Sequence, residues 1–495
     1  MIRREAPRPP ACRLLALLGL SLIPVAFVSA QAPGQAPPTS PVAPPAPPVT
    51  PAPPVTPVPT ATLPVPGTAH PAEGQLIDLP TSLRLAGAGN LDLALVREAQ
   101  NQAKAASDAA LLRFFPWLSV GTSYAKHTGA GQDFPGDVVD VDKALYRSAV
   151  SVNMQLDLGS AVFQRLASQQ LQSAAGYDSD AKRNDTTLAA ATAYFDLVNA
   201  VANSDIAREA VRISQGYEHE LERAAETGLT NRSDVLRVSV QTQRAQIVLR
   251  QAEAAVQTAS VALATLLRLD ASIRLLPAER IVAPTTLVPL DRPTAELVRD
   301  ALESRPELKG SAAAVAAADQ LRIAAKYGPL IPSLNAQALY GRLKGGANGF
   351  IGDELGSHDY IVGLSWRLGP GGLFDFSRTE LAQSQLRQQR LKDQKLRDTI
   401  AQQVADAYEA AHAGFDQISL ARRAAELARK SLDLSEQRRQ FGVYAVLEVI
   451  QAQQDLTQAR RDYAQALAQY AKAQYSLARA TSRLGGASPA APALP

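Results

Sequence analysis

Apolar and polar residues alternate in four segments of the chain, and a period of two residues predicts β-strands. In the first segment Leu118 and Val120 fall on one side of the chain, and Ser119 and Gly121 fall on the other. The apolar sides of the four segments are made by Leu118, Val120, Thr122 and Tyr124; by Val150, Val152, Met154, Leu156 and Leu158; by Leu334, Ala336, Ala338 and Tyr340; and by Tyr360, Val362, Leu364, Trp366 and Leu368. Each predicted strand therefore has one apolar face and one polar face.

Strands with two such faces fit two environments. A membrane barrel has apolar side chains toward lipid and polar side chains toward water, and a strand of about ten residues can cross the hydrocarbon. A soluble sheet packed on helices would show the same alternation. Aromatic residues in and near the strands favour the barrel, because aromatic girdles mark the two membrane interfaces. The predicted girdle residues are Trp117, Tyr124, Tyr146, Tyr340, Tyr360 and Trp366.

Helices are predicted before and after each pair of strands. A helix is expected near Leu91–Arg113 and another near Ser311–Tyr327, each followed by a proline that stops it. Two proline-free stretches, residues 160–227 and 376–439, follow the strands, and each would span about 100 Å as one continuous helix. Their composition is too polar for lipid, so we expect them to project into an aqueous compartment.

The long helices are expected to fold back as hairpins. Apolar residues in the second one recur at steps of four and three, which predicts a coiled-coil seam. The seam residues are Ile400, Val404, Tyr408, Ala411, Phe415 and Ile418. Each long helix is expected to end at a glycine turn, Gly228 or Gly442, and a second helix returns to about Leu269 or Leu484. Ser233 or the turn backbone can cap the first returning helix, and Asp234 falls in its first turn.

The same order of elements occurs twice, about 215 residues apart, which indicates a duplicated structural unit. The matching segments are Asn90-Leu91-Asp92-Leu93 with Arg305-Pro306-Glu307-Leu308, Phe115-Pro116-Trp117-Leu118 with Ile331-Pro332-Ser333-Leu334, Asp157-Leu158-Gly159 with Arg367-Leu368-Gly369, and Gly228–Leu236 with Gly442–Ile450. Four strands cannot close a barrel, and an open edge in lipid leaves backbone groups unpaired. Several chains must then share one barrel, eight-stranded with two copies or twelve-stranded with three.

The ends of the chain differ in composition from the rest. Arg3 and Arg4 open a basic start, an apolar run follows, and Val28-Ser29-Ala30 forms a small-residue cleavage site, as in a secretory signal peptide. The alternative is an uncleaved anchor helix. Cys12 precedes the apolar run, so no lipid anchor is expected.

A proline-rich segment follows, which predicts an extended spacer or, alternatively, a binding segment. The predicted divisions are a signal peptide (1–30), a disordered tether (31–75), a first repeat (76–285), a second repeat (286–486) and a disordered tail (487–495).

Composition argues against several classes of function. The net charge of +3 with 20% charged residues is too mild for a nucleic-acid partner. The five histidines are scattered without the spacing of metal ligands, and neither a Gly-x-Ser-x-Gly elbow nor a phosphate-binding loop occurs. We therefore expect no enzyme, with no catalytic residue, no metal and no cofactor.

These residues resemble the TolC-like outer-membrane efflux protein family over about residues 76–486. The resemblance rests on the two openings Asn-Leu-Asp-Leu and Arg-Pro-Glu-Leu, the Pro-x-Leu strand starts, the Leu-Gly strand exits and the two glycine turns, in the same order twice. It implies an α+β membrane protein: a trimeric outer-membrane β-barrel with four strands per chain, continued by a long α-helical coiled-coil tunnel in the periplasm. It also implies a homotrimer in outer-membrane lipid that works with a periplasmic adaptor and an inner-membrane pump.

The resemblance further implies that the glycine turns form a closed periplasmic tip with a gate. The residues that it assigns to this tip are Gly228, Asp234, Gly442, Glu448 and Gln451. Glu448 would face the pore in an acidic constriction, and Gln451 stands where the family often has a second acid. Asp234 and Glu448 also fit a simpler role, since acidic side chains stabilise helix N-termini.

The expected function is thus a passive outer-membrane exit duct of a tripartite efflux pump. Two alternatives share part of the pattern: the outer-membrane component of type I protein secretion, and a trimeric envelope scaffold or adhesin that transports nothing.

Overall fold

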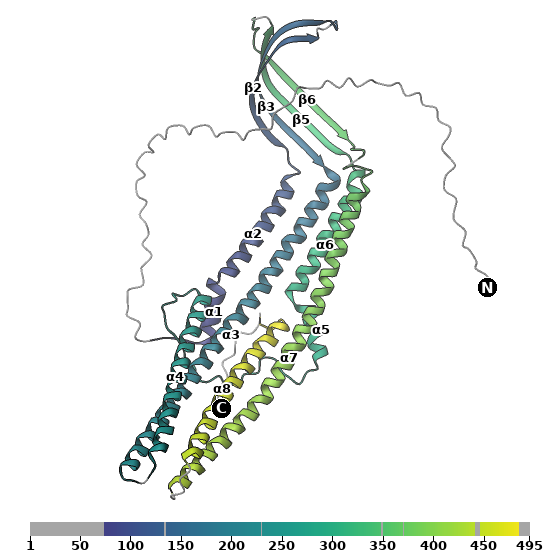
Figure 1. Cartoon of the computed structure of the whole chain (residues 1–495). Coiled ribbons are helices and arrows are strands. Elements are labelled where there is room, and N and C mark those ends of the chain that lie inside the picture. The colour runs from purple at the N-terminus through teal and green to yellow at the C-terminus, as the bar shows by residue number, and fades with distance from the viewer. Residues whose placement is uncertain are drawn as a thin grey trace, which may run out of the picture. The chain divides into compact units, whose positions relative to one another are not determined.

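Two sets of elements follow each other in the same order along the chain (Figure 1). In the first set are β1 (Gln75–Ile77), α1 (Leu79–Gly89), α2 (Leu91–Leu112), β2 (Trp117–Gln132), β3 (Val138–Asp157), α3 (Leu158–Glu226) and α4 (Arg232–Leu267). In the second set are β4 (Leu275–Pro277), α5 (Thr294–Ser304), α6 (Pro306–Tyr327), the short 3₁₀ helix η1 (Gly328–Leu330), β5 (Ser333–Ala347), β6 (Leu355–Ser365), α7 (Phe376–Gln440) and α8 (Val446–Ala480). The predicted helix–strand–strand–helix–helix order is confirmed in both sets.

This computed structural model describes residues 74–132, 135–228, 230–347, 350–369, 371–440 and 446–484. The predicted signal peptide, nearly all of the predicted tether, the predicted tail and Gly442 lie outside the described residues. Gln75, the last residue of the predicted tether, is the first residue of β1. The repeat boundaries at residues 76–285 and 286–486 remain a prediction.

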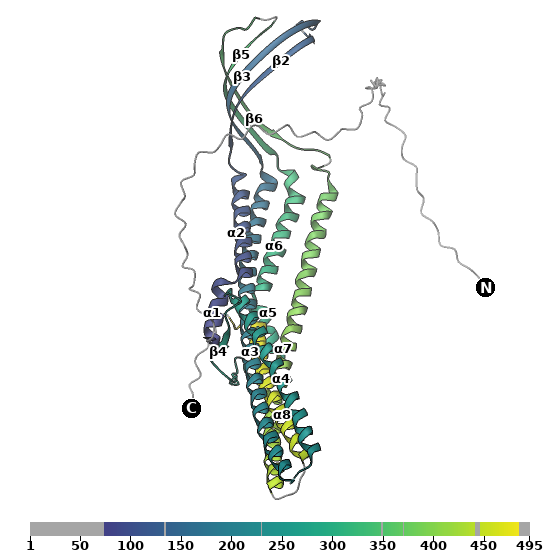
Figure 2. The ribbon, with the colours of Figure 1, turned by 60° about the vertical axis from the view of Figure 1, so that its left-hand side comes forward.

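The four long strands form one antiparallel sheet in the order β2-β3-β5-β6 (Figure 2). Each of the four predicted segments falls mainly in one of these strands, which have 16, 20, 15 and 11 residues and so exceed the roughly ten residues that can cross the hydrocarbon. The two predicted hairpins are joined through β3 and β5, which come from different repeats. Strands β2 and β6 are the two edges of the sheet.

The strands end earlier at the helices than the alternation predicts. β3 ends at Asp157 and Leu158 is already helical, while β6 ends at Ser365. Just beyond the first boundary, Gly159 has no room for a side chain, because a Cβ there would lie 2.2 Å from the Gly328 carbonyl oxygen. The backbones of α3 and η1 therefore approach more closely than any side chain would allow.

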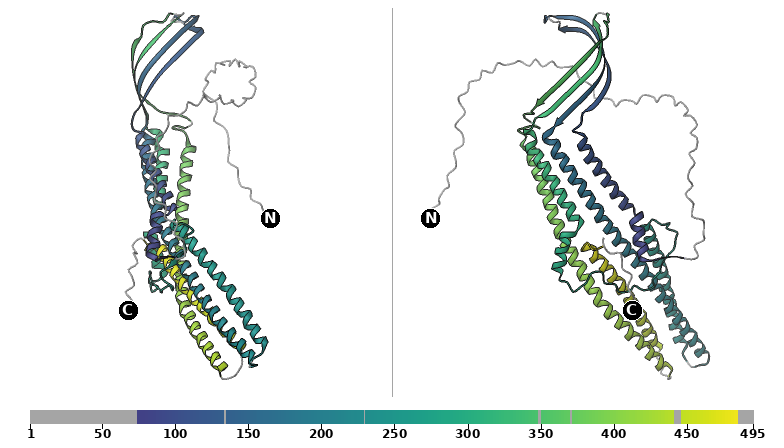
Figure 3. Two further views of the ribbon diagram at one scale, coloured as in Figure 1. Left: turned by 90° about the vertical axis from the view of Figure 1, so that its left-hand side faces the viewer. Right: turned by 180° about the vertical axis from the view of Figure 1, so that it is seen from behind.

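Both long helices are continuous. α3 has 69 residues and α7 has 65, so each is about 100 Å long at 1.5 Å per residue. Figure 3 shows the hairpins α3/α4 and α7/α8 side by side, with α8 packed against both α7 and α3. No helix in the described part of the chain is both long and apolar enough to cross a membrane.

Local signals fix the starts of the shorter helices. The Asn90 side chain accepts hydrogen bonds from the backbone N–H groups of Asp92 (2.8 Å) and Leu93 (3.3 Å), which caps α2. The second of these helices, α6, begins at Pro306 rather than at the predicted Ser311, since proline is favoured in the first turn of a helix. The short helices α1 and α5 were not predicted, although Asp78 caps α1 through Thr81.

The core lies between the helices in two clusters. The larger one occupies the middle of the helical part, and its fully buried side chains include Tyr194, Leu197, Leu263, Ile400, Leu467 and Leu477. The smaller one lies near the ends of the hairpins and includes Tyr217, Leu221, Val238, Leu432, Val449 and Ile450. These clusters join α3, α4, α7 and α8, so both repeats contribute to each.

The predicted coiled-coil seam of α7 is confirmed only in its first part. Ile400, Val404 and Ala411 are fully buried, but Phe415 is 55% exposed. Gly414 takes the buried position instead, because its missing side chain lets α7 approach the Tyr470 backbone of α8. The Phe415 ring lies beside the Tyr470 ring, with centroids 5.9 Å apart.

Candidate functional site: the two-faced sheet, the helix junction and the tip

The register of the sheet brings its polar residues together on one face. Asn153 donates to Ser119 Oγ (2.8 Å), and Gln337 donates to Asn153 Oδ1 (2.9 Å). The hydroxyls of Ser119 and Ser151 are 2.9 Å apart, so β2, β3 and β5 share one network of neutral hydrogen bonds. Because these polar groups stay exposed, this face is suited to line a water-filled space.

The opposite face is apolar and also exposed. Leu118 on β2 pairs in register with Val152 on β3, and Ala338 on β5 pairs with Tyr360 on β6. The exposed fractions are 65% for Leu118 and 78% for Tyr360. A large apolar surface left open to solvent marks a contact with lipid or protein. The predicted separation of faces is confirmed along the helix-proximal part of all four strands.

The apolar face has a height that suits a membrane. It extends along β3 from Leu156 to Tyr146, about 33 Å along the strand at about 3.3 Å per residue, or about 25 Å vertically at the tilt of membrane strands. Tyr124 and Tyr146 end it together, with ring centroids 4.6 Å apart. Beyond this pair Lys126 and Asp142 form an ion pair of 3.4 Å. On β2 and β3 the face therefore changes from apolar to charged beyond the tyrosine pair, whereas on β5 the charge begins one row closer to the helices, at Arg342 in register with Ser148.

The tryptophans do not share this apolar face within the strands. Trp117 pairs in register with Asn153, so it belongs to the polar face. Trp366 lies one residue beyond β6, and its indole N–H donates to the Leu330 carbonyl (3.3 Å). The sequence prediction placed both tryptophans in the strands; this is confirmed for Trp117, the first residue of β2, and wrong for Trp366, which follows the end of β6. Tyr340 and Tyr360 do lie on the apolar face.

Residues 297–483, from within α5 to just beyond α8, match the family model of the outer membrane efflux proteins. This part of the chain carries the outer membrane efflux protein domain. The chain is accordingly an outer-membrane protein whose helices extend into the periplasm.

Other comparisons agree with this assignment at different levels. Protein CyaE of Bordetella pertussis is 34% identical over 129 residues, which are 26% of this chain and 25% of CyaE. The match thus spans about a quarter of the length of that curated relative.

The fold is shared with solved outer-membrane channels. CmeC of Campylobacter jejuni superposes with a TM-score of 0.71 at 17% identity, over 82% of this chain and 85% of CmeC. VceC of Vibrio cholerae gives a TM-score of 0.67 at 17% identity, over 81% of this chain and 95% of VceC. The open state of MtrE from Neisseria gonorrhoeae gives 0.64 at 18% identity, over 81% and 88%.

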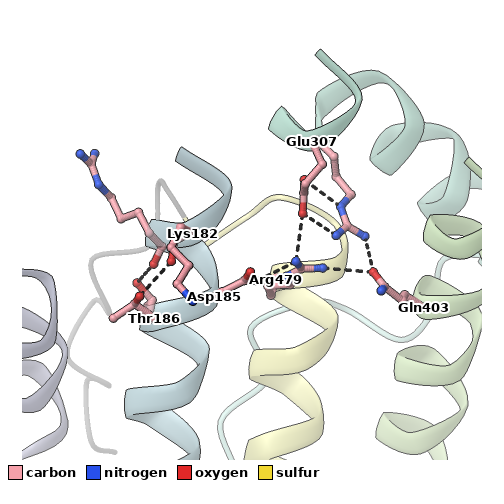
Figure 4. Close-up of polar contacts among 9 residues, drawn as sticks. Lys182, Asp185, Thr186, Glu307, Gln403 and Arg479 are labelled. Atoms are coloured by element: carbon pink, nitrogen blue, oxygen red, sulfur yellow. Dashed lines mark hydrogen bonds and ion pairs between the residues drawn. The ribbon is translucent and has the colours of Figure 1, made fainter. Parts of the chain in front are cut away.

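The protein also contains a buried ion network where four helices meet (Figure 4). Arg305, which is 2% exposed, binds Glu307 through two hydrogen bonds of 3.2 and 2.7 Å. Arg479 at the end of α8 binds Glu307 (2.9 Å) and Asp185 of α3 (2.7 Å). Gln403 of α7 accepts hydrogen bonds from both arginines. The network thereby connects α3, α6, α7 and α8 across the two repeats.

The charges of this network change the ionisation of Glu307. Burial by itself would raise the pKa of this carboxyl group, but hydrogen bonds from Arg305 and the positive charges of Arg305 and Arg479 lower it below its ordinary value. Glu307 belongs to the repeated Arg-Pro-Glu-Leu motif, but the sequence did not predict that it would join four helices. Its partner Arg479 lies 172 residues further along the chain, and no local pattern links the two.

Acid is expected to weaken this junction. Since the folded-state pKa of Glu307 is depressed, its stabilising effect is present above the pKa of the unfolded chain and is lost as the pH falls through the folded-state value. Urea unfolding followed by circular dichroism should show a midpoint that falls below about pH 5 more steeply for the wild type than for Glu307→Gln. Identical slopes for the two proteins would rule out Glu307 as the titrating group.

At the other end of the helices lie the residues predicted for the tip. Gly228 follows α3 with φ +75°, a conformation that favours glycine. Asp234 lies in the first turn of α4 as predicted and pairs with Arg237 (3.3 Å). Asn231 is the N-cap residue without a side-chain hydrogen bond, so Ser233 does not cap this helix. Asp234 therefore has a local ion-pair partner at the start of α4.

Glu448 lies in the first turn of α8 and has a partner that was not predicted. Its Oε1 accepts hydrogen bonds from Arg438 Nη1 (2.9 Å) and Ser435 Oγ (3.4 Å) of α7. The sequence did hold a signal for this pair. Arg438 is a basic residue shortly before the turn and Glu448 an acidic residue shortly after it, and a hairpin brings together residues on both sides of its loop. Glu448, Gln451 and Asp455 line one open groove of about 460 Å³. The second acid beside Glu448 in this groove is thus Asp455 rather than residue 451.

Proposed function

We propose that three copies of this chain close one twelve-stranded barrel in the outer membrane and form a passive exit duct. In this proposal a periplasmic adaptor joins the helical tip to an inner-membrane transporter, which delivers the cargo. The role of the chain is conduction, and no residue acts as a catalyst. The match of residues 297–483 to the efflux-protein family model supports the class of function, and the geometry of the sheet supports its form.

The observation that carries the proposal is a two-faced sheet with two open edges. Strands β2 and β6 each have one paired neighbour in the described sheet. In lipid, each unpaired backbone group costs several kcal/mol, so the edges need partners. Single-chain membrane barrels begin at about eight strands, whereas this chain supplies four. Pairing β6 of one copy with β2 of the next would satisfy both edges.

The helices carry apolar stripes that support self-association. On α7, Leu420, Leu427 and Leu434 recur every seven residues and are 66%, 59% and 59% exposed. On α4, Val240 and Ile247 have the same spacing and are 53% and 58% exposed. Leucine and β-branched residues at heptad spacing are the surfaces that coiled coils bury. We infer that neighbouring copies cover these stripes and continue the barrel as a helical tunnel.

We further propose that the hairpin ends form the gate of the duct. Gly228, Asp234 and Glu448 stand at or beside these turns, and Gly442 would complete the second turn. The ion pair between Arg438 and Glu448 compensates part of the acidic charge, so a ring of three Glu448 side chains would be a weaker cation site than bare carboxylates. Adaptor binding would open the tip by contacting the open state better than the closed one.

Conductance tests the duct and the gate together. Purified protein in planar lipid bilayers is expected to conduct as a trimer, and Glu448→Gln should relieve block by multivalent cations by about threefold or more. Glu426→Gln removes the same charge from the exposed Arg422–Glu426 pair of α7 and should leave the block unchanged. Absence of any conductance would contradict the duct, and equal block in all three proteins would contradict the gate role of Glu448.

The two alternatives predict different consequences of deletion in the cell. A drug-efflux duct would lower drug resistance when lost, and a type I secretion duct would retain its protein cargo inside the cell. A scaffold would change neither and would give no conductance. The shared element order and the CyaE match do not separate the first two, so cargo assays decide between them.

A further inference from the structure

The register of the sheet sorts the charged residues of the outer strand ends onto two faces. Arg147 pairs with Ser123 and Leu343, and Lys143 pairs with His127 and Ala347, so both cations lie on the face that carries the polar network. Lys126, Asp142, Arg342 and Lys344 occupy the alternate positions of β2, β3 and β5 and lie on the opposite face. Charge is therefore distributed unequally between the two faces.

On the opposite face acids balance the cations in number, since Asp140, Asp142 and Glu354 stand against Lys126, Arg342 and Lys344, although Lys344 itself has no ion pair among the described residues. Lys126 pairs with Asp142 (3.4 Å), and Arg342 pairs with Glu354 (3.5 Å). Arg147 and Lys143 have no ion pair among the described residues, and Arg147 is exposed. The sorting thus leaves two uncompensated positive charges on one face near the outer end of the sheet.

The acids of the same face lie closer to the helices. Asp359 of β6 lies in the same row across the sheet as Ser151 of β3, and Ser151 is four residues along β3 from Arg147. Asp157 is the last residue of β3, at the helix end of the sheet. Four residues correspond to about 13 Å along a strand, which exceeds the screening length of about 8 Å at physiological ionic strength. Asp359 therefore compensates Arg147 only weakly, and His127 beside Lys143 would add positive charge when protonated.

Apolar side chains surround these cations on the same face. Leu145 and Leu343 flank Arg147 along β3 and across to β5, and Leu355 continues the row on β6. Walls of low polarity reduce screening and strengthen the field of a nearby charge. The pattern of cation and leucine is complementary to a solute that has an anionic group and an apolar body.

We propose that Arg147 and Lys143 make the outer part of the duct selective for anions, with the neighbouring leucines favouring amphiphilic anions. This inference rests on the proposed duct, in which three copies would place six such cations around one lumen. Rings of arginine and lysine are the usual device of anion and phosphate pores. A lipid headgroup is not the expected ligand, because these side chains lie on the face opposite to Leu118 and Tyr360.

The test compares two double variants that remove the same charge from opposite faces. In planar bilayers under a potassium chloride gradient, the chloride-to-potassium permeability ratio of R147Q/K143Q should fall by about twofold or more relative to the wild type. The chloride-to-potassium permeability ratio of the double variant K126Q/K344Q should stay unchanged, because these lysines would lie outside the lumen. Micromolar decanoate should block the wild type more strongly than decyltrimethylammonium, and R147Q/K143Q should lose this preference.

Each other outcome has a defined meaning. An equal fall in both double variants, or no fall in either, would overturn the proposal while leaving the duct intact. The proposal would also be overturned by a wild-type trimer whose chloride-to-potassium permeability ratio equals the ratio of the two ions' mobilities in free solution. A protein that forms no conducting trimer would instead contradict the proposed function on which this inference rests.

Discussion

Replacing Glu307 with glutamine is expected to lower the free energy of unfolding by about 3–5 kcal/mol, because it leaves buried Arg305 without its acidic partner. Arg305 is 2% exposed, and Glu307 is its partner in a two-bond ion pair. Arg479 would lose one of its two acids at the same time. Urea denaturation of the detergent-solubilised protein, followed by helical circular dichroism, measures the change.

Glu209 provides the matched control for burial. It also binds an arginine through two hydrogen bonds, to Arg212 at 2.8 and 2.6 Å, but both side chains are well exposed. Glu209→Gln should therefore cost less than about 1 kcal/mol, as exposed pairs do. Equal losses for Glu209→Gln and Glu307→Gln would mean that burial does not set the strength of the junction.

A second large effect is expected on the sheet. Ala338→Arg places a charge on the apolar face, between Val152 and Tyr360, and should destabilise the membrane-inserted protein by about 2–4 kcal/mol. This row lies near the middle of the apolar height between Leu156 and Tyr146. The measurement is the fraction of folded, protease-resistant protein in lipid vesicles across a urea series.

The adjacent residue supplies the control. Leu339→Arg changes an apolar residue to the same cation, but it lies on the polar face directly opposite Asp359. We expect Leu339→Arg to insert nearly as well as the wild type, because water and Asp359 can solvate the charge. If both variants insert equally well, the apolar face does not contact lipid.

Much of the secondary structure could be predicted because it is encoded locally. Two-residue alternation identified all four long strands, and the absence of proline identified both long helices. The fully buried side chains of Ile400 and Val404 followed from helical spacing. The second half of the seam could not be predicted this way, because Gly414 rather than Phe415 meets α8.

Residues at the tip were predicted by position but not by partner. Asp234 and Glu448 lie in the first turns of α4 and α8, where a helix start accepts acidic side chains. The compensation of Glu448 by Arg438 depends on how the hairpin closes, which spacing alone does not specify.

The amino-acid sequence by itself determined the periodic features of this protein: two-faced strands, long polar helices and their duplication. These depend on residues a few positions apart, so local spacing is sufficient to read them. Tertiary structure alone decided which distant residues meet, as in the junction of Arg305, Glu307 and Arg479. It also decided which cations stay uncompensated on the polar face, because ion pairing depends on register between strands and not on order along the chain.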